Sequence, residues 1–274
     1  MLPSANRPGH HSLEHTVVVK YGGNAMGQPR TPDVTLEEVA GLWRAGVPVV
    51  LVHGGGPDID RALRARGIAT ERIEGLRVTT SETLDVTEGV LCATVNKRIV
   101  RAFAGLGVTA VGISGQDGAL LVAERERSAS GADLGYVGSV VACNPQVVTE
   151  LLTSGFLPVV APLAIARDGS HAYNVNADSA AAALAAALHA SSFIAITNVP
   201  RVLRDPDDPA SGIDAMTIDE ARAFAGSDAC RSSMKPKLFA AADAVAAGAS
   251  ASYVCDAKPG AIAAALAGDA TIVR

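Results

Sequence analysis

Short apolar runs alternate with amphipathic stretches along most of this 274-residue chain. The apolar runs are rich in β-branched residues and predict buried strands at residues 17–20, 49–52, 108–113, 157–161, 193–197 and 251–255. Apolar positions at helical spacing and strong helix formers predict helices at residues 35–45, 57–66, 83–106, 145–154, 177–190, 217–225, 235–247 and 260–267. Strands that alternate with helices form βαβ units, so we expect an α/β fold: a three-layer α-β-α sandwich around a mainly parallel open sheet.

Three segments between these elements have other patterns. Residues 67–80 predict an exposed hairpin or loop, and residues 198–213 a loop rich in aspartate and proline. Residues 124–138 alternate weakly and contain several glycines, which predicts short antiparallel strands that cover a site. Ligands of a parallel sheet bind beyond the carboxyl ends of its strands, and we expect the site there. A boundary between two lobes is expected near residue 190.

Composition and charge exclude several classes of protein. The net charge of −5 provides no positive field for nucleic acid and no basic stripe for a membrane surface, so we expect neither partner. The first 16 residues include Pro3, Pro8 and Gly9 and lack the apolar core of a signal peptide; we expect a disordered extension. No apolar run is long enough to span a membrane. The four cysteines lack the spacing of a zinc site or a disulfide framework, and we expect a cytoplasmic protein.

Two glycine-rich turns follow two of the predicted strands: Lys20-Tyr-Gly-Gly-Asn24 and His53-Gly-Gly-Gly-Pro57. Glycines let backbone N–H groups approach a ligand, and three glycines before a helix form an anion-binding nest with the helix dipole behind it. The alternatives are a tight turn without a ligand and a lysine that is merely solvated. Neither turn has the spacing of a P-loop or a dinucleotide fingerprint, and the nucleophile elbow of an esterase is missing. We expect His53 to be a hydrogen-bonded structural residue.

Three charged residues further along the chain complete a set that favours phosphoryl transfer. Asp178 ends the alternating segment Asn174-Val-Asn-Ala-Asp178, whose polar residues share one face if the segment is extended; the alternative is that they only cap the next helix. Lys237 lies in the first turn of a predicted helix, where a cation opposes the helix dipole; a solvated charge pair is the alternative. Arg77 is a candidate carboxylate clamp or an ordinary surface arginine. Two lysines, glycine turns and one aspartate suit a reaction in which the protein positions anions and neutralises their charge.

Taken in order, seven segments resemble the acetylglutamate kinases, a branch of the amino acid kinase family. These segments are Lys20-Tyr-Gly-Gly-Asn-Ala-Met26, Val52-His-Gly-Gly-Gly-Pro57, Gly75-Leu-Arg-Val-Thr79, Val95-Asn-Lys97, Gly112-Ile-Ser-Gly115, Asp133-Leu-Gly-Tyr-Val-Gly138 and Tyr173-Asn-Val-Asn-Ala-Asp178. The resemblance implies an amino acid kinase-like fold with two lobes after the extension of residues 1–16: residues 17–190 would bind acetylglutamate, and residues 191–274 the nucleotide. It also implies ATP-dependent phosphorylation of the γ-carboxylate of N-acetyl-L-glutamate to N-acetyl-L-glutamyl 5-phosphate, the second step of arginine biosynthesis, with Mg²⁺ bound through the nucleotide phosphates.

The resemblance further implies a role for individual residues. Lys20 and Lys237 would stabilise the transferring phosphoryl group, and Asp178 would hold both ammonium groups in place. Phosphoryl oxygens would accept hydrogen bonds from the N–H groups of Gly23 and Gly55. The substrate would contact Gly55, Gly56, Arg77 and Asn174, the last two at its α-carboxylate end. The nucleoside would contact Thr197, Asn198, Val199, Leu203 and Met234, and no protein residue would bind a metal directly.

Several positions depart from the family's pattern, mostly in the nucleotide half, where Asn198 replaces an aspartate and Ser232-Ser233 replace two glycines. Two alternatives therefore stay open. One is a kinase for carrier-protein-bound α-aminoadipate in lysine biosynthesis, although we find no basic docking patch for a carrier. The other is a catalytically weak homologue that binds an amino acid as a regulatory protein. The first 16 residues lack the helical period of arginine-inhibited hexameric members, so we expect a homodimer; the sequence does not identify a regulatory partner.

Overall fold

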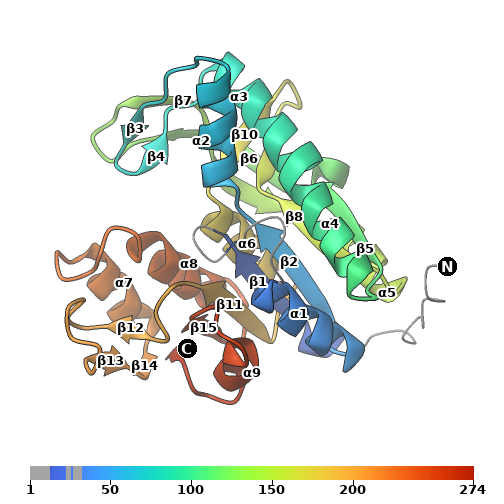
Figure 1. Ribbon diagram of the computed structural model, residues 1–274. Coiled ribbons are helices and arrows are strands. Elements are labelled where there is room, and N and C mark those ends of the chain that lie inside the picture. Colours follow the sequence, from blue (N-terminus) through green and yellow to red (C-terminus); the bar gives the residue numbers. More distant parts are fainter. Residues whose placement is uncertain (1–12, 23–25, 27–32) are drawn as a thin grey trace.

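The apolar runs form the centre of one mixed sheet (Figure 1). The computed structural model describes residues 13–22, 26 and 33–274, and within them eight strands form this sheet. In sheet order they are β14 (Ala215–Met216), β16 (Thr271–Val273), β15 (Ser252–Cys255), β11 (Ser192–Ile196), β1 (Val17–Tyr21), β2 (Val49–His53), β8 (Leu157–Ala161) and β5 (Ala110–Ser114). Neighbouring strands are parallel except β15 and β16. The predicted mainly parallel open sheet is confirmed.

Helices cover both faces of this sheet and complete three layers (Figure 1). On one face pack α6 (Ala177–Ala187) and α8 (Lys235–Ala246). On the other pack α1 (Val34–Arg44), α4 (Asn96–Gly105) and α9 (Ala261–Leu266). Further helices are α2 (Gly56–Ala65), α5 (Gln146–Thr153), α7 (Ile218–Gly226) and the short 3-10 turn η4 (Asp117–Ala119). The alanine-rich α6 is buried on most sides, as predicted, because its small side chains let it lie close to both the sheet and α8.

The helix predicted over residues 83–106 consists of three elements. It begins as α3 (Ser81–Glu88), where the Thr80 hydroxyl caps the helix by accepting from the backbone N–H of Thr83. It then widens into the π-helix η3 (Gly89–Val95) before continuing as α4. Such bulges occur frequently at functional sites. Here the bulge sets Leu91 so close to Gly55 that a Cβ atom at Gly55 would lie 2.6 Å from Leu91 Cδ2.

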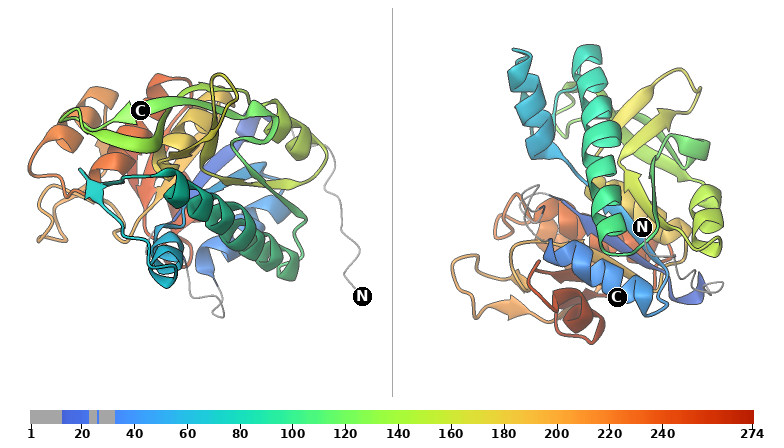
Figure 2. Two further views of the ribbon diagram at one scale, coloured as in Figure 1. Left: turned by 90° about the horizontal axis from the view of Figure 1, so that it is seen from above. Right: turned by 45° about the vertical axis from the view of Figure 1, so that its right-hand side comes forward.

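The segments predicted as loops or short strands contain further sheet structure. A small closed barrel is formed by β6 (Leu121–Arg127), β7 (Asp133–Cys143), β9 (Leu163–Ala166) and β10 (Ala172–Val175). Its β6 and β7 are the antiparallel pair predicted near residues 124–138. In the right-hand view of Figure 2, these green to yellow strands lie above the central strands, and the orange to red C-terminal third lies below them.

Two small hairpins border the site described below. β3 (Arg72–Ile73) and β4 (Leu76–Arg77) form the hairpin predicted within residues 67–80. The aspartate- and proline-rich loop contains a second hairpin, β12 (Val202–Leu203) with β13 (Gly212–Ile213), which the sequence did not predict. These strands are only two residues long, too short for a pattern of alternating side chains to reveal them.

The two predicted lobes share the central sheet, because β1 pairs in parallel with β11. The predicted boundary near residue 190 falls in the connection between α6 and β11, and the assignment of one ligand to each lobe stays a prediction. The predicted disorder is wrong for the end of the extension, since Leu13–His15 form a 3-10 helix (η1) and Thr16 is buried. Residues 1–12 and Gly23 lie outside the described residues. In the described part of the chain, no helix has the length and apolar character that crossing a membrane requires.

We expect Gly115→Ala to destabilise the protein. Gly115 lies where β5 meets the barrel, and an added Cβ would lie 2.2 Å from the carbonyl oxygen of Leu163. Overpacking of this kind lowers the free energy of unfolding by about 1–3 kcal/mol. The matched control is Gly41→Ala in the middle of α1, where nothing lies within 4 Å of the new Cβ; it should raise that free energy by about 0.5–1 kcal/mol. Urea denaturation measures both, and equal stabilities for the two variants would contradict this packing.

Candidate active site

Two lysines from distant parts of the chain share one carboxylate beyond the carboxyl end of β1. Lys20 lies near the end of β1, Asp178 in the first turn of α6, and Lys237 in the first turn of α8. Lys20 Nζ lies 3.0 Å from Asp178 Oδ1, and Lys237 Nζ lies 3.7 Å from Asp178 Oδ2. Lys20 and Asp178 are only 5% and 6% exposed. The structure thus brings together the three residues predicted to be catalytic.

Asp178 is available to the lysines because another residue caps its helix. Asn176 is the N-cap of α6, and its side-chain oxygen accepts a 2.8 Å hydrogen bond from the backbone N–H of Asp178. The capping alternative therefore applies to Asn176 and not to the carboxylate of Asp178. Apart from its ion pair with Lys20, the buried Asp178 Oδ1 has no hydrogen-bond partner among the described residues.

The trio of Lys20, Asp178 and Lys237 carries one net positive charge in a partly desolvated place. The pKa of Lys237 is lowered, first by burial and then by the charge of Lys20, while Asp178 acts in the opposite direction. The dipole of α8 adds further positive potential at this point. An anion placed against the two ammonium groups would offset their mutual repulsion, so the arrangement favours binding of a phosphoryl group or a carboxylate.

The second glycine turn forms one wall of a cavity of about 240 Å³ next to this trio. The backbone N–H of Gly54 donates a 2.8 Å hydrogen bond to the carbonyl of Tyr21, which ties the turn to the end of β1. Gly55 is the N-cap of α2 and offers no side chain, so the first N–H groups of the helix are left for a ligand. A larger residue at Gly55 would collide with Leu91 of η3. Gly55 and Gly56 both line the cavity, and their contact with a substrate stays a prediction.

The same cavity is lined by Arg77 and Asn174, the residues predicted to bind the α-carboxylate end of a substrate. Arg77 is only 6% exposed, so the alternative of an ordinary surface arginine is wrong. Its Nη2 pairs with the carboxylate of Asp60, whereas its buried Nη1 has no hydrogen-bond partner among the described residues. Asn174 lies on the neighbouring β10 and donates to the hydroxyl of Thr79 at 3.3 Å. A buried guanidinium with a free donor is suited to a carboxylate.

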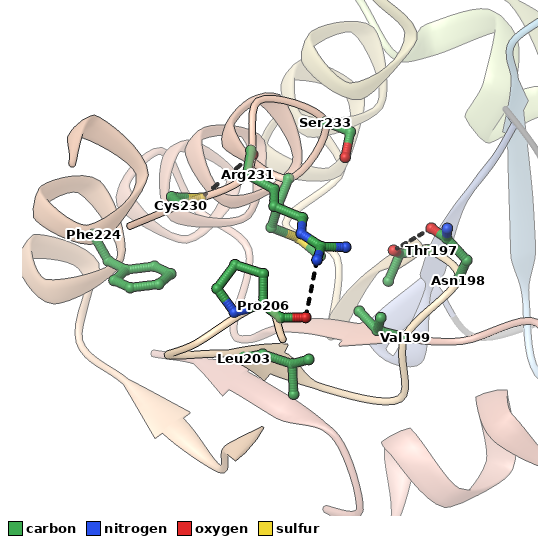
Figure 3. A pocket seen from close by; sticks show the side chains of 10 residues that line it. Thr197, Asn198, Val199, Leu203, Pro206, Phe224, Cys230, Arg231 and Ser233 are labelled. Atoms are coloured by element: carbon green, nitrogen blue, oxygen red, sulfur yellow. Dashed lines mark hydrogen bonds between the residues drawn. The ribbon is translucent and has the colours of Figure 1, made fainter. Parts of the chain in front are cut away.

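A second cavity, of about 70 Å³, lies in the C-terminal third of the chain (Figure 3). Its lining includes every residue predicted to contact the nucleoside: Thr197, Asn198, Val199, Leu203 and Met234. Apolar walls with a few polar groups suit a heteroaromatic ring with a polar edge. Arg231 and Pro206 also line this cavity, and Arg231 donates a 3.0 Å hydrogen bond to the carbonyl of Pro206 (Figure 3). Met234 precedes Lys237 by three residues, so the beginning of α8 connects this cavity to the lysine pair.

His53 is a structural residue, as predicted. It is fully buried, and its Nδ1 lies 2.8 Å from the carbonyl oxygen of Gly54. The amide nitrogen of Asn96 lies 3.2 Å from His53 Nε2 and also donates to the carbonyls of Ile113 and Val159. Because Asn96 donates to Nε2, the proton of the neutral ring is on Nδ1. Burial lowers the pKa of His53 to about 4, so the ring stays neutral and fixes the glycine turn.

The sequence did not identify three residues that support this site. Asn96 lies in one of the recognised segments, but nothing in the pattern showed that its amide would reach His53. Leu91 looked like an ordinary core position of a helix. Asp60 follows Gly56 by four residues and therefore shares its side of α2, which is the signal that could have found it. In the part of the chain that the structure describes, no group of three or more His, Cys, Asp or Glu side chains is placed to hold a metal ion.

Comparisons with known proteins match most of this chain. The family model described as "Amino acid kinase family" matches residues 15–256. The acetylglutamate kinase of Thermoanaerobacter sp. (strain X514) is 39% identical over 89% of this chain and 80% of its own length. A crystal structure of smu.665 from Streptococcus mutans superimposes with a TM-score of 0.76 at 28% identity, covering 88% of this chain and 94% of that chain. Carbamate kinase from Giardia lamblia bound to AMP-PNP has a TM-score of 0.66 at 17% identity over 95% of this chain and 98% of that chain, and it supports the fold alone.

We expect the burial of neutral His53 to make stability depend on pH. In the unfolded chain His53 takes up a proton near pH 6.5, whereas in the folded protein it does so only near pH 4. The unfolded state therefore binds more protons between these values, and stability is lost as the pH falls through this window. The loss should approach about 3 kcal/mol at the low end and be absent above pH 6.5. Urea denaturation from pH 7 to 4 measures it, with His53→Gln as the reference; equal pH slopes for both proteins would contradict the prediction.

Proposed function

The chain belongs to the amino acid kinase family, and from this premise we propose that it phosphorylates the γ-carboxylate of N-acetyl-L-glutamate with ATP. The observation that carries the proposal is the carboxylate of Asp178 held between Lys20 and Lys237, next to a cavity with an unpaired donor of Arg77. The product would be N-acetyl-L-glutamyl 5-phosphate, formed in the second step of arginine biosynthesis. A relative covering most of this chain is named acetylglutamate kinase, which supports this substrate.

The proposed reaction joins two anions, so its main demand on the protein is electrostatic. A γ-carboxylate is already ionised at neutral pH, and no general base is needed to activate it. Lys20 and Lys237 would lie between this carboxylate and the γ-phosphate, reduce their repulsion and stabilise the charge that spreads over the transferring group. Asp178 would keep the two ammonium groups at fixed positions. The N–H of Gly55, at the beginning of α2, would donate to a phosphoryl oxygen.

The other end of the substrate would lie against Arg77 and Asn174. The free Nη1 of Arg77 is buried at the cavity wall, where low exposure strengthens a charge-assisted hydrogen bond to an α-carboxylate. Asn174 would donate to the same end of the substrate. Because Gly55 and Gly56 have no side chains, the substrate could lie close to the beginning of α2. This orientation directs the γ-carboxylate towards the lysine pair, since Lys20 lines the same cavity.

The nucleoside of ATP would occupy the second cavity, in contact with Thr197, Asn198, Val199, Leu203 and Met234. Its phosphates would then extend past the first turn of α8 towards Lys237. Asp178, a buried carboxylate of the site, is engaged by lysines and is a poor partner for a cation. We therefore propose that Mg²⁺ enters with ATP as part of the nucleotide substrate, bound to the phosphates.

The two alternatives from the sequence are not favoured. Relatives that are 38–40% identical over most of this chain are named acetylglutamate kinase and not for a carrier-bound substrate. A catalytically weak regulatory homologue would not need the two lysines and the aspartate, yet all three are in place. We further propose that the protein acts in the cytoplasm as a homodimer.

We expect ADP release with Mg-ATP to depend on N-acetyl-L-glutamate and on Lys237. Lys237→Ala should reduce kcat by about 10²–10³-fold, because it removes a preorganised cation from the transferring phosphoryl group. The matched control is Lys235→Ala, two residues earlier in the same helix, whose ammonium group is not paired with Asp178. That variant should keep kcat within about threefold of the wild type, since it lacks a contact with the reacting groups.

The same assay tests the substrate, with free and carrier-bound α-aminoadipate in place of N-acetyl-L-glutamate. Turnover of the carrier-bound compound alone would instead assign the protein to lysine biosynthesis. No turnover of any of the three would contradict the proposed function, and equal losses in the two lysine variants would contradict the role of Lys237.

We expect the purified protein to elute from gel filtration as a dimer whose mass does not change with arginine. The expectation follows from the proposed homodimer. The measurement is the light-scattering mass with and without arginine, together with activity across an arginine titration. A hexamer that is inhibited at low arginine would show the expectation to be wrong.

A further inference from the structure

Asp60 is a partly buried carboxylate that the proposed chemistry does not use. It lies on α2, one turn after the glycine nest, and its side chain is 31% exposed. It forms ion pairs with two guanidinium groups: Oδ1 with Nη2 of Arg77, and Oδ2 with Nη2 of Arg72 at 3.5 Å. The two arginines line the substrate cavity, whereas Asp60 is not part of its lining. Asp60 therefore lies behind the groups that a substrate would touch.

The ion pair with Asp60 leaves one nitrogen of the Arg77 guanidinium without a partner among the described residues. Because Nη2 is bound to Asp60, the guanidinium is held at one end, and the unpartnered, buried donor is Nη1. The backbone of Arg77 is held as well, since its carbonyl accepts a 2.9 Å hydrogen bond from the hydroxyl of Thr79. The same hydroxyl accepts from Asn174 at 3.3 Å. One chain of contacts thus connects Asp60, Arg77, Thr79 and Asn174.

We propose that Asp60 is a positioning residue that gives the site its preference for a substrate with an α-carboxylate. It would hold Arg77 at the cavity wall with Nη1 left unpaired, and this inference rests on the proposed function. The charges support it, because Asp60 with Arg72 and Arg77 carries one net positive charge that a single carboxylate would neutralise. A guanidinium restrained in its bound geometry also loses less conformational freedom when the substrate arrives.

The test compares two substrates in wild type and Asp60→Ala. N-acetyl-L-glutamate carries the α-carboxylate; 4-acetamidobutanoate is the same molecule without it and keeps the carboxylate that is phosphorylated. In the variant, kcat/KM for N-acetyl-L-glutamate should fall about 10–100-fold, the size expected for a charge-assisted hydrogen bond, and mainly through KM. The value for 4-acetamidobutanoate should stay within about twofold, because it never uses Arg77. Asp60→Asn should recover part of the loss, since its amide oxygen still accepts from Nη2.

A control variant separates positioning from general charge effects. Glu71→Gln removes a negative charge from an exposed position next to the β3–β4 hairpin and should leave both substrates unaffected. An Asp60→Ala variant that loses activity equally with both substrates would show a merely structural role and overturn the inference. Unchanged or improved turnover of N-acetyl-L-glutamate would also overturn it, the latter because Asp60 would then compete with the substrate for Arg77.

The assay distinguishes failure of the proposed function from failure of this inference. If the proposed function is wrong, neither the wild type nor the residue-60 variants turn over N-acetyl-L-glutamate. Asp60 is then judged by thermal unfolding with each compound, which needs no catalysis. Stabilisation of the wild type by N-acetyl-L-glutamate, but not by 4-acetamidobutanoate, and its loss in Asp60→Ala would support the inference; any other pattern would overturn it.

Discussion

One carboxylate shared by two ammonium groups is the interaction on which the arrangement of this molecule depends. Charges as buried as Lys20 and Asp178 are tolerated only when they are paired, because each loses much of its hydration. The pairing requires β1, α6 and α8, which are far apart in the sequence, to meet at one edge of the sheet. The trio keeps one net positive charge, so the folded protein presents an unsatisfied attraction for an anion. Folding and the attraction for an anion thus depend on the same three side chains.

A second cluster at the cavity beside the trio repeats this arrangement of charges with other residues. There Asp60 lies between Arg72 and Arg77, as Asp178 lies between two lysines. The lysines suit a phosphoryl group that must move, since an ammonium is a compact charge that imposes little geometry; the planar guanidinium suits a carboxylate that must stay in place. The glycine turn between the two clusters is fixed by His53 and Asn96, which are neutral and add no competing charge.

The sequence predicted the parts of this structure that depend on local pattern. The central strands and the covering helices follow from apolar periodicity, and Lys20, Asp178 and Lys237 were identified by their positions at element ends. The local pattern of the sequence does not predict which elements contact one another. The π-helix at residues 89–95 is indistinguishable by composition from the α-helices on either side, and the role of Asp60 depends on a hairpin that folds back over α2. The resemblance to a family located Arg77, but only the structure shows why it is buried and which of its nitrogens is free.

The register of the central sheet explains why both cavities lie at the same edge of the sheet. In the parallel pairing of β1 with its neighbours, Lys20 is opposite Ala195 of β11 and Val52 of β2. The residues that follow on those strands, Thr197 and Gly54, therefore emerge beside Lys20 at the same edge, one lining each cavity. A slip of one residue in either pairing would turn the side chain of Lys20 to the other face of the sheet, away from Asp178. Such a slip would separate the buried charges of Lys20 and Asp178, which are tolerated only as a pair, so the ion pair itself opposes it. Sheet register and charge pairing thus support each other.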